Sequence, residues 1–213
     1  MNTKVSDFKL VPVLKSHTAD IAKLHRLALP NGFLSTLGDG FLGALYLGIG
    51  KAPKSVVWVA VNDKDEVLGF VSGTCDVKNC YKSVLSTSFF QLGWNAIPSL
   101  FHLSVGKRIW ETLIYPFKNE KSPDDNHKQA NAELLSIAVS EKARGMGLGR
   151  ALVKKLEASF VEWGHLNEYQ VVTDALDSRS NGFYGGLGFT FQKEFFHHGH
   201  PMHRYYKTPD EVS

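Results

Sequence analysis

The most constraining feature of the sequence is a glycine-rich segment, RGMGLGRA at 144–151, which lies between an apolar run and an amphipathic one. The preceding AELLSIAV, at 132–139, is typical of a buried strand. From Leu148 to Phe160 an apolar residue recurs at every fourth position, which predicts a helix. Glycine allows positive φ and a close backbone approach, and a helix N-terminus carries about half a positive charge. The arrangement therefore predicts a phosphate-binding site.

Two familiar phosphate-binding loops do not match this segment. A P-loop has Lys and then Ser or Thr after its last glycine, whereas Arg150 and Ala151 stand there. The dinucleotide fingerprint has the spacing GxGxxG, whereas the glycines at 145, 147 and 149 give GxGxG. For this run taken alone, a glycine-rich turn without a ligand remains the alternative.

Length and composition indicate one globular domain over residues 1–213, since 43% of the residues are hydrophobic. The net charge of +3 is too small to make nucleic acid the expected partner, but it allows anionic ligands. The only cysteines, Cys75 and Cys80, indicate neither a disulfide framework nor a zinc ribbon, and we expect reduced thiols in the cytoplasm. The first ten residues lack the apolar stretch of a signal peptide.

The remaining pattern alternates strands and helices. Pro12 confines the run at 8–15 to an edge strand. We expect a helix at 16–29, and its expected apolar face consists of Ile21, Leu24, Leu27 and Ala28. The other expected elements are a helix at 41–49, a hairpin of strands at 55–61 and 67–77, a strand at 169–175, a short helix at 178–188, and a hairpin of strands at 189–196 and 202–207.

Two motifs in this order resemble the GNAT superfamily of acyl-CoA-dependent N-acyltransferases. RGMGLG matches the superfamily's pyrophosphate loop, R/Q-x-x-G-x-G/A, through Arg144, Gly147 and Gly149. FYGGLGF at 183–189 resembles its second signature, FYxxxGF. The resemblance covers nearly the whole chain. It implies an α/β (α+β) GNAT fold, in which helices flank a central mixed, mostly antiparallel sheet with splayed strands.

The resemblance also implies where acetyl-CoA binds. The pantetheine arm runs beside the strand before the glycine loop, and the loop holds the pyrophosphate. Where the family often has Asn and Ala, seven and four residues before the signature Tyr, this chain has Asp177 and Ser180. The cofactor-binding residues implied are Ile137, Ala138, Val139, Arg144, Gly145, Met146, Gly147, Leu148, Gly149, Arg150, Ser180 and Phe183.

Two catalytic residues follow from the resemblance. An amine with a pKa of about 10.4 is almost fully charged at neutral pH, so transfer needs a base. Glu133 lies where several GNAT enzymes have a catalytic glutamate, and an acid inside an apolar strand has a raised pKa. Tyr184 would protonate the departing thiolate. The alternatives are a water-facing Glu133, a core Tyr184 bonded to backbone, and a covalent route through Cys75.

Four histidines, His197, His198, His200 and His203, lie within seven residues of a predicted hairpin turn. No Cys or carboxylate completes a recognisable metal-ligand spacing, so no metal is expected. Because the family's corresponding hairpin borders the acceptor site, contact with the acceptor or a secondary proton-accepting role is the favoured use.

Residues from about 78 to 128 are the part least like the family core, and we expect a helical insert there. The stretch at 83–106 carries no charge, but polar residues interrupt it, so membrane contact is not expected. A lone helical pair cannot bury all its apolar residues. We therefore expect the insert to form a cap over the acceptor end of the sheet, with some homodimer contact. Binding of the insert to lipid is the alternative. These residues are Phe89, Phe90, Trp94, Ile97, Leu100, Phe101, Ile109, Trp110 and Leu113.

The resemblance as a whole implies a cytoplasmic N-acetyltransferase that transfers an acetyl group from acetyl-CoA to the primary amine of a small molecule by direct attack. Two alternatives remain open. One is a protein N-acetyltransferase acting on α-amino or lysine groups, which would need an open groove. The other is a catalytically silent acyl-CoA-binding module, which retention of both Glu133 and Tyr184 argues against.

Overall fold

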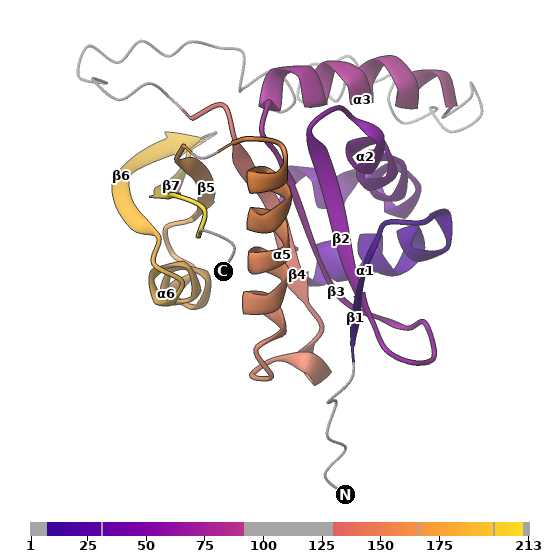
Figure 1. The fold of residues 1–213 in the computed structure, drawn as a ribbon, viewed down its shortest axis with the longest axis horizontal. Helices are drawn as coiled ribbons and strands as arrows, with labels where there is room; N and C mark the ends of the chain where they lie inside the picture. Colours follow the sequence, from indigo (N-terminus) through magenta and orange to yellow (C-terminus); the bar gives the residue numbers. More distant parts are fainter. Residues whose placement is uncertain (1–7, 31, 92–129, 166, 198, 211–213) are drawn as a thin grey trace, which may run out of the picture.

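The computed structural model describes residues 8–30, 32–91, 130–165, 167–197 and 199–210. These residues form a seven-stranded sheet with the order β1-β2-β3-β4-β5-β7-β6 (Figure 1). Only the β4–β5 pair is parallel, so the sheet is mixed and mostly antiparallel, as expected. The strands are β1 Lys9–Pro12, β2 Ser55–Val61, β3 Val67–Thr74, β4 Glu133–Val139, β5 Tyr169–Asp174, β6 Thr190–His197 and β7 His200–Lys207.

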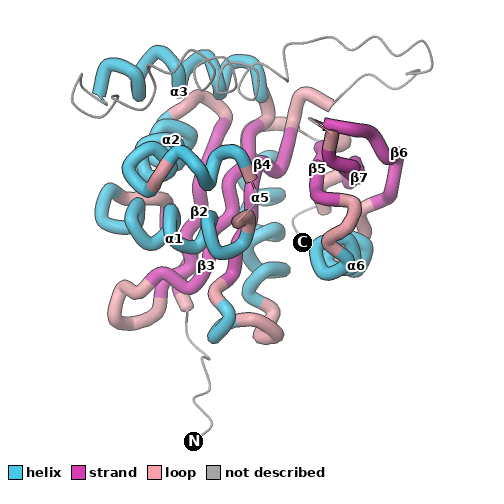
Figure 2. The backbone as a smooth tube through the Cα atoms, turned by 180° about the vertical axis from the view of Figure 1, so that it is seen from behind, coloured by secondary structure: helices cyan, strands magenta, loops and turns pink. Residues whose placement is uncertain are grey.

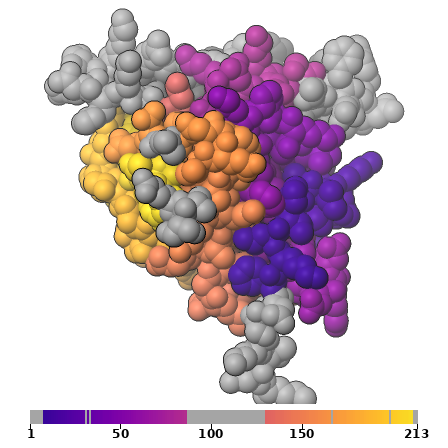
Figure 3. All heavy atoms as spheres, viewed as in Figure 1, coloured from indigo at the N-terminus to yellow at the C-terminus, as the bar shows by residue number. Residues whose placement is uncertain are grey.

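Helices cover both faces of the sheet (Figures 1 and 2). The helices α1 and α2 pack on one face, where their apolar residues form a core with residues of β2 and β3. The helix α5 packs on the other face over a second core, and it forms the middle of the surface in Figure 3. The described helices are α1 Thr18–Ala28, α2 Asp39–Lys51, α3 Val77–Gln91, α5 Leu148–Glu162 and α6 Ser178–Gly186, with short 3-10 turns at Lys15–His17, Phe33–Leu37 and Glu141–Ala143.

Two hairpins and an edge strand form as the sequence predicts. The turn between β2 and β3 places Asp65 at φ 61°, and the Asn62 side chain accepts bonds from the backbone N–H groups of Lys64 and Glu66. The β6–β7 hairpin turns through Gly199 at φ 81°. Pro12 ends β1, which pairs on one side only, with β2. Proline's missing donor is tolerated at such an edge.

The buried face of α1 differs from the expected one. Leu27 is 68% exposed and Ala28 is also exposed, whereas Ile21, Ala22 and His25 are buried. A histidine is accepted at the core position because its Nδ1 lies 2.6 Å from the Tyr46 hydroxyl of α2. The hydrogen bond satisfies a polar group that the apolar pattern would place outside.

The strands β4 and β5 separate after a single point of pairing. Glu133 and Gln170 are their only registered partners, so the two strands diverge beyond this pair. On its other side β4 stays paired with β3, with a register shift at Ser72/Gly73. We call the Glu133–Gln170 position the fork, and it confirms the expected splayed strands.

The start of the expected insert is the helix α3, which lies across one end of the sheet and packs against α2 (Figure 1). The backbone N–H of Val77 donates to the carbonyl of Asn131, just before β4. The second helix of the expected pair and the loop after it fall at 92–129, outside the described residues, as do the side chains on which the expected cap and dimer contact depend. No helix in the described ranges is long and apolar enough to cross a membrane.

A glycine allows α5 to pack closely on the sheet. A Cβ added at Gly69 of β3 would lie 2.8 Å from the carbonyl oxygen of Ala138 and 3.4 Å from side-chain atoms of Leu148 and Leu152. The nearest atom belongs to the backbone of β4, so an added side chain at Gly69 would clash unless β4 itself moved.

We therefore expect Gly69→Ala to lower the free energy of unfolding by about 1–3 kcal/mol, the usual cost of overpacking a core. Gly40→Ala is the control, because nothing lies within 4 Å of a Cβ at that position in α2. The control should be neutral or stabilise by up to about 1 kcal/mol, since alanine is the better helix former. Urea unfolding of both variants measures this, and equal stabilities would contradict the close packing.

Candidate active site

The glycine loop joins β4 to α5 and leaves open space around its backbone. Gly145 and Gly147 have φ values of 77° and 78°, which few other residues adopt, and nothing lies within 4 Å of a Cβ built on either. Gly147 is the N-cap of α5, and the first backbone bond of the helix runs from the Ala151 N–H to the Gly147 carbonyl at 3.0 Å. The N–H groups of residues 148–150 precede that bond, so they are available to an anion.

The side chains of the loop have separate tasks. The Arg150 guanidinium donates to the carbonyl of Gly186 at 3.0 Å, which ties the end of α6 to the start of α5. The Arg144 guanidinium lies 3.3 Å from the Glu141 carboxylate and is 40% exposed. Leu148 is buried in the α5-side core, and Met146 is 44% exposed. The loop therefore offers a ligand its backbone N–H groups and one exposed, positively charged side chain, that of Arg144.

The third glycine brings α6 against this loop. A Cβ at Gly149 would lie 2.9 Å from the ring of Phe183, so only glycine allows the observed contact. The ring of Phe183 in turn lies 5.4 Å from that of Tyr184. Phe183 thus packs between the glycine loop and the tyrosine rather than facing open solvent.

The backbone of β4 beyond the fork has one unpaired edge. Ile137, Ala138 and Val139 pair with β3 on one side, but they have no registered partner in β5 on the other. Their N–H and C=O groups on the β5 side are therefore free to pair with an extended ligand.

Glu133 lies at the fork on the face that carries α1, α2 and α3. Its neighbour Leu134 points into the α5-side core, and successive side chains alternate between faces. Gln170 Nε2 donates to Glu133 Oε2 at 2.8 Å. Burial raises the pKa of Glu133, while the hydrogen bond from Gln170 and the charge of Arg204 lower it to a smaller extent. The net result is a carboxyl group that binds a proton more readily than one in water.

Tyr184 lies on the opposite face, in the α5-side core. Its ring is 5.3 Å from that of Phe189 and 6.1 Å from that of Tyr205. Burial, followed by the charge of Asp177, raises the pKa of Tyr184 above its usual value. Its hydroxyl has no hydrogen-bond partner among the described residues. Glu133 and Tyr184 thus lie on opposite faces of the sheet.

Comparison with known families and structures accounts for this arrangement. The sequence model of the Acetyltransferase (GNAT) family matches residues 33–189. The chain belongs to the GNAT family of acetyltransferases. No curated protein matches the sequence.

Solved structures share the GNAT fold at low sequence identity. Ard1 from Thermoplasma volcanium has a TM-score of 0.58 at 11% identity, with 96% of this chain and 99% of that chain covered. NAA60 from Arabidopsis thaliana, solved with acetyl-CoA, has a TM-score of 0.58 at 13% identity, with coverages of 95% and 98%. A chimera of spermidine N-acetyltransferase SpeG from Vibrio cholerae has a TM-score of 0.57 at 15% identity, and 96% of both chains is covered.

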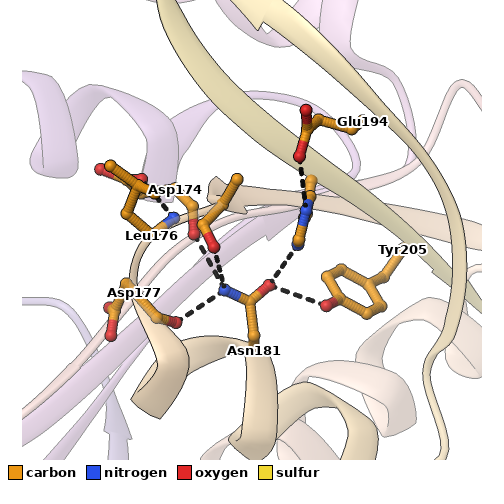
Figure 4. A network of polar contacts seen from close by, with 8 residues as sticks. Asp174, Leu176, Asp177, Asn181, Glu194 and Tyr205 are labelled. Carbon is orange, nitrogen blue, oxygen red and sulfur yellow. Dashed lines mark hydrogen bonds and ion pairs between the residues drawn. The ribbon is translucent and has the colours of Figure 1, made fainter.

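In this GNAT chain a polar network holds the short helix α6 (Figure 4). The Asn181 amide donates to the backbone carbonyls of Asp174, Ala175 and Asp177, and its oxygen accepts from the Tyr205 hydroxyl at 2.7 Å. Asn181 was not predicted as a site residue. A polar residue inside a glycine-rich helix before the aromatic signature is the signal that could have identified it.

The described histidines of the β6–β7 hairpin belong to no group that could hold a metal ion. His197 and His200 are registered partners across the turn. His203 Nδ1 lies 2.9 Å from the Asn181 oxygen, and its Nε2 lies 3.1 Å from a Glu194 oxygen. His198 lies outside the described residues, and within the described ones no three His, Cys, Asp or Glu side chains could hold a metal ion.

The two cysteines of this GNAT chain are buried free thiols. Burial raises the pKa of Cys75 to about 12, so its thiol stays protonated near neutral pH. A protonated thiol is a poor nucleophile, which disfavours the covalent route through this residue.

The start of α6 allows a test of how firmly the helix is held. Asp177 is the N-cap and accepts from the backbone N–H groups of Arg179 and Ser180 and from the Ser180 hydroxyl. Ser180, implied as a cofactor-binding residue, therefore uses its hydroxyl within the cap. The Ser180 hydroxyl is also the largest cause that lowers the pKa of Asp177.

We expect Asp177→Ala to reduce the free energy of unfolding by about 1 kcal/mol at pH 7, whereas Asp177→Asn keeps most of the cap. The folded-state pKa of Asp177 is lowered, so its contribution is present above its unfolded pKa and is lost as the pH falls through the folded value. The stability difference between wild type and Asp177→Ala should therefore shrink in acid. Urea unfolding from pH 7 to pH 3 measures it; a difference that stays constant would exclude an ionised cap.

Proposed function

We propose that this GNAT enzyme is a cytoplasmic N-acetyltransferase that moves an acetyl group from acetyl-CoA directly to the primary amine of a small molecule. The observation that carries the proposal is that two candidate groups lie on opposite faces of the sheet in which β4 and β5 diverge. A partly buried, hydrogen-bonded carboxyl group, Glu133, lies on one face, and the buried phenol of Tyr184 lies on the other. The buried free thiols of Cys75 and Cys80 support a reducing compartment.

The glycine loop and the β4 edge fit acetyl-CoA. The open space beside Gly145 and Gly147 and the free N–H groups at the start of α5 suit a pyrophosphate, with Arg144 able to add a positive charge. The unpaired edge at 137–139 suits an extended arm that forms backbone hydrogen bonds. When bound there, acetyl-CoA would supply an acyl group already activated as a thioester.

Glu133 is proposed as the base that makes the amine nucleophilic. An amine with a pKa of about 10.4 is neutral only on the order of one part in two thousand at pH 7, so proton removal must accompany attack. Burial raises the pKa of Glu133, which strengthens it as a base near neutral pH. Its face of the sheet is the one on which α3 lies, so we place the acceptor amine on that face.

Tyr184 is proposed as the group that donates a proton or hydrogen bond to the departing sulfur. Its raised pKa keeps the phenol protonated across the neutral range. The Phe189 and Tyr205 rings fix its orientation, and its hydroxyl has no bond within the described residues that would need to break first.

The surroundings of Glu133 favour a small acceptor over a protein. Tyr81 and Cys80 of α3 lie close enough that the charge of Glu133 raises the pKa of both, after the larger effect of burial. Residues of the helix α3 therefore lie close to the carboxyl group. A protein substrate would need an open groove beside Glu133, where residues of α3 lie. Protein acetylation is therefore the second candidate function.

We expect Gly147→Ala to weaken CoA binding by about tenfold or more, because the added methyl group enters the space proposed for the pyrophosphate. Gly164→Ala is a matched control at the other end of α5, since Gly164 has φ 75° and nothing within 4 Å of a Cβ. Both substitutions cost about 1–2 kcal/mol of backbone strain. Calorimetric titration with CoA, together with melting temperatures, separates the effects. Equal affinities of the two variants would remove the loop from the proposed site.

We expect Glu133→Gln to lower kcat/KM by ~10²-fold or more near neutral pH, the usual scale for loss of a general base. The deficit should shrink toward pH 10, because the amine is then neutral without help. The measurement is thiol release from acetyl-CoA with polyamines, amino sugars and peptides as acceptors. A deficit that is the same at every pH would contradict the base role.

The same assay distinguishes the proposal from its alternatives. Turnover with peptides alone would establish the protein acetyltransferase. Tight CoA binding by wild type without turnover on any amine would support the catalytically silent module.

A further inference from the structure

We propose that Gln170 is the positioning residue for Glu133, which it holds at the fork and keeps able to exchange a proton. This inference rests on the proposed function of Glu133 as the base. Gln170 was not among the residues that the sequence indicated. It is the second residue of β5, between the core residues Tyr169 and Val171.

The contact between the two side chains coincides with the only point where β4 and β5 pair. Gln170 Nε2 donates to Glu133 Oε2 at 2.8 Å, and Gln170 and Glu133 are registered Cα partners. The backbone N–H of Gln170 also donates to the carbonyl of Ala132 at 3.0 Å. Both residues are thus fixed by backbone pairing, and the side-chain bond sets the direction of the carboxylate.

Burial of the Gln170 amide is unfavourable, because its hydrogen bond to Glu133 satisfies only the nitrogen. The residue is 4% exposed, and its Oε1 has no hydrogen-bond partner among the described residues. A buried amide oxygen without a partner is unfavourable, so a leucine or valine in this core strand would be the more stable choice. The polar side chain is therefore better explained by its action on Glu133 than by packing.

Within the described residues, the other charged or titratable groups that interact with Glu133 are Arg204, Cys80 and Tyr81. Arg204 of β7 contributes a positive charge, and its guanidinium lies 4.9 Å from the centre of the Phe195 ring while its Nε has no partner in the described residues. Cys80 and Tyr81 of α3 lie near Glu133. Both are protonated near neutral pH, because burial raises their pKa values. The direct partner of the carboxylate is thus the neutral amide of Gln170.

A neutral amide suits a group that must gain and lose a proton. The ionised carboxylate accepts a bond from the amide nitrogen. After Glu133 takes a proton, a rotated amide offers its oxygen to the new O–H group, so the pair stays bonded in both states. A lysine or arginine in the same place would hold Glu133 ionised and make it a weaker base.

The test is Gln170→Met, which keeps the volume and removes the donor. Loss of a hydrogen bond to a charged group should lower kcat/KM at pH 7 by about tenfold and shift the acidic limb of its pH profile to higher pH. Gln170→Glu should shift the limb further in the same direction, because a second carboxylate disfavours ionised Glu133. CoA affinity should not change.

Gln192→Met is the matched control, since Gln192 of β6 also has a buried amide oxygen without a partner among the described residues but does not bond to Glu133. Gln192→Met should leave the acidic limb of the pH profile of kcat/KM unchanged. In the Glu133→Gln background, Gln170→Met should have little further effect on rate. An unchanged limb in folded Gln170→Met and Gln170→Glu would overturn the positioning role while leaving the base intact. An active Glu133→Gln enzyme would instead overturn the proposed function itself.

Discussion

The separation of β4 from β5 after the Glu133–Gln170 pair is the constraint on which the rest of the site depends. Buried backbone N–H and C=O groups need partners, and a parallel pair that continued would satisfy them within the sheet. Because pairing stops, residues 137–139 keep one edge free. The same strand leads directly into the glycine loop, so the open edge and the open helix N-terminus are consecutive parts of one path.

Splayed strands also allow chemistry from both faces of one sheet. In a continuous sheet the side chains of Glu133 and Tyr184 would be separated by the backbone layer, with α1 to α3 on one side and α5 and α6 on the other. Where the strands part, no backbone lies between the faces. In the proposed mechanism, Glu133 and Tyr184 act from opposite faces on a single bond that lies between the separated strands.

Local patterns predicted the glycine loop, the two hairpins and the pair of signatures, because these depend on residues close in sequence. The missed features depend on contacts between distant elements. Leu27 looked buried by periodicity, but the bond between His25 and Tyr46 of α2 made the histidine the inward residue. Gln170 is an ordinary polar residue in sequence, and only the pairing of β5 with β4 brings it to Glu133.

Two glutamates on opposite faces show why the partner decides the role of a buried carboxylate. Glu157 of α5 is 2% exposed; its Oε1 lies 2.6 Å from Lys207 Nζ and accepts from the Tyr169 hydroxyl at 2.6 Å. These two contacts join α5 to β7 and β5. Glu133, one strand away, has a neutral amide in that place and a raised pKa. Adjacent residues of β5, Tyr169 and Gln170, therefore bond to two different carboxyl groups: Glu157, which joins α5 to the sheet, and Glu133, the proposed base.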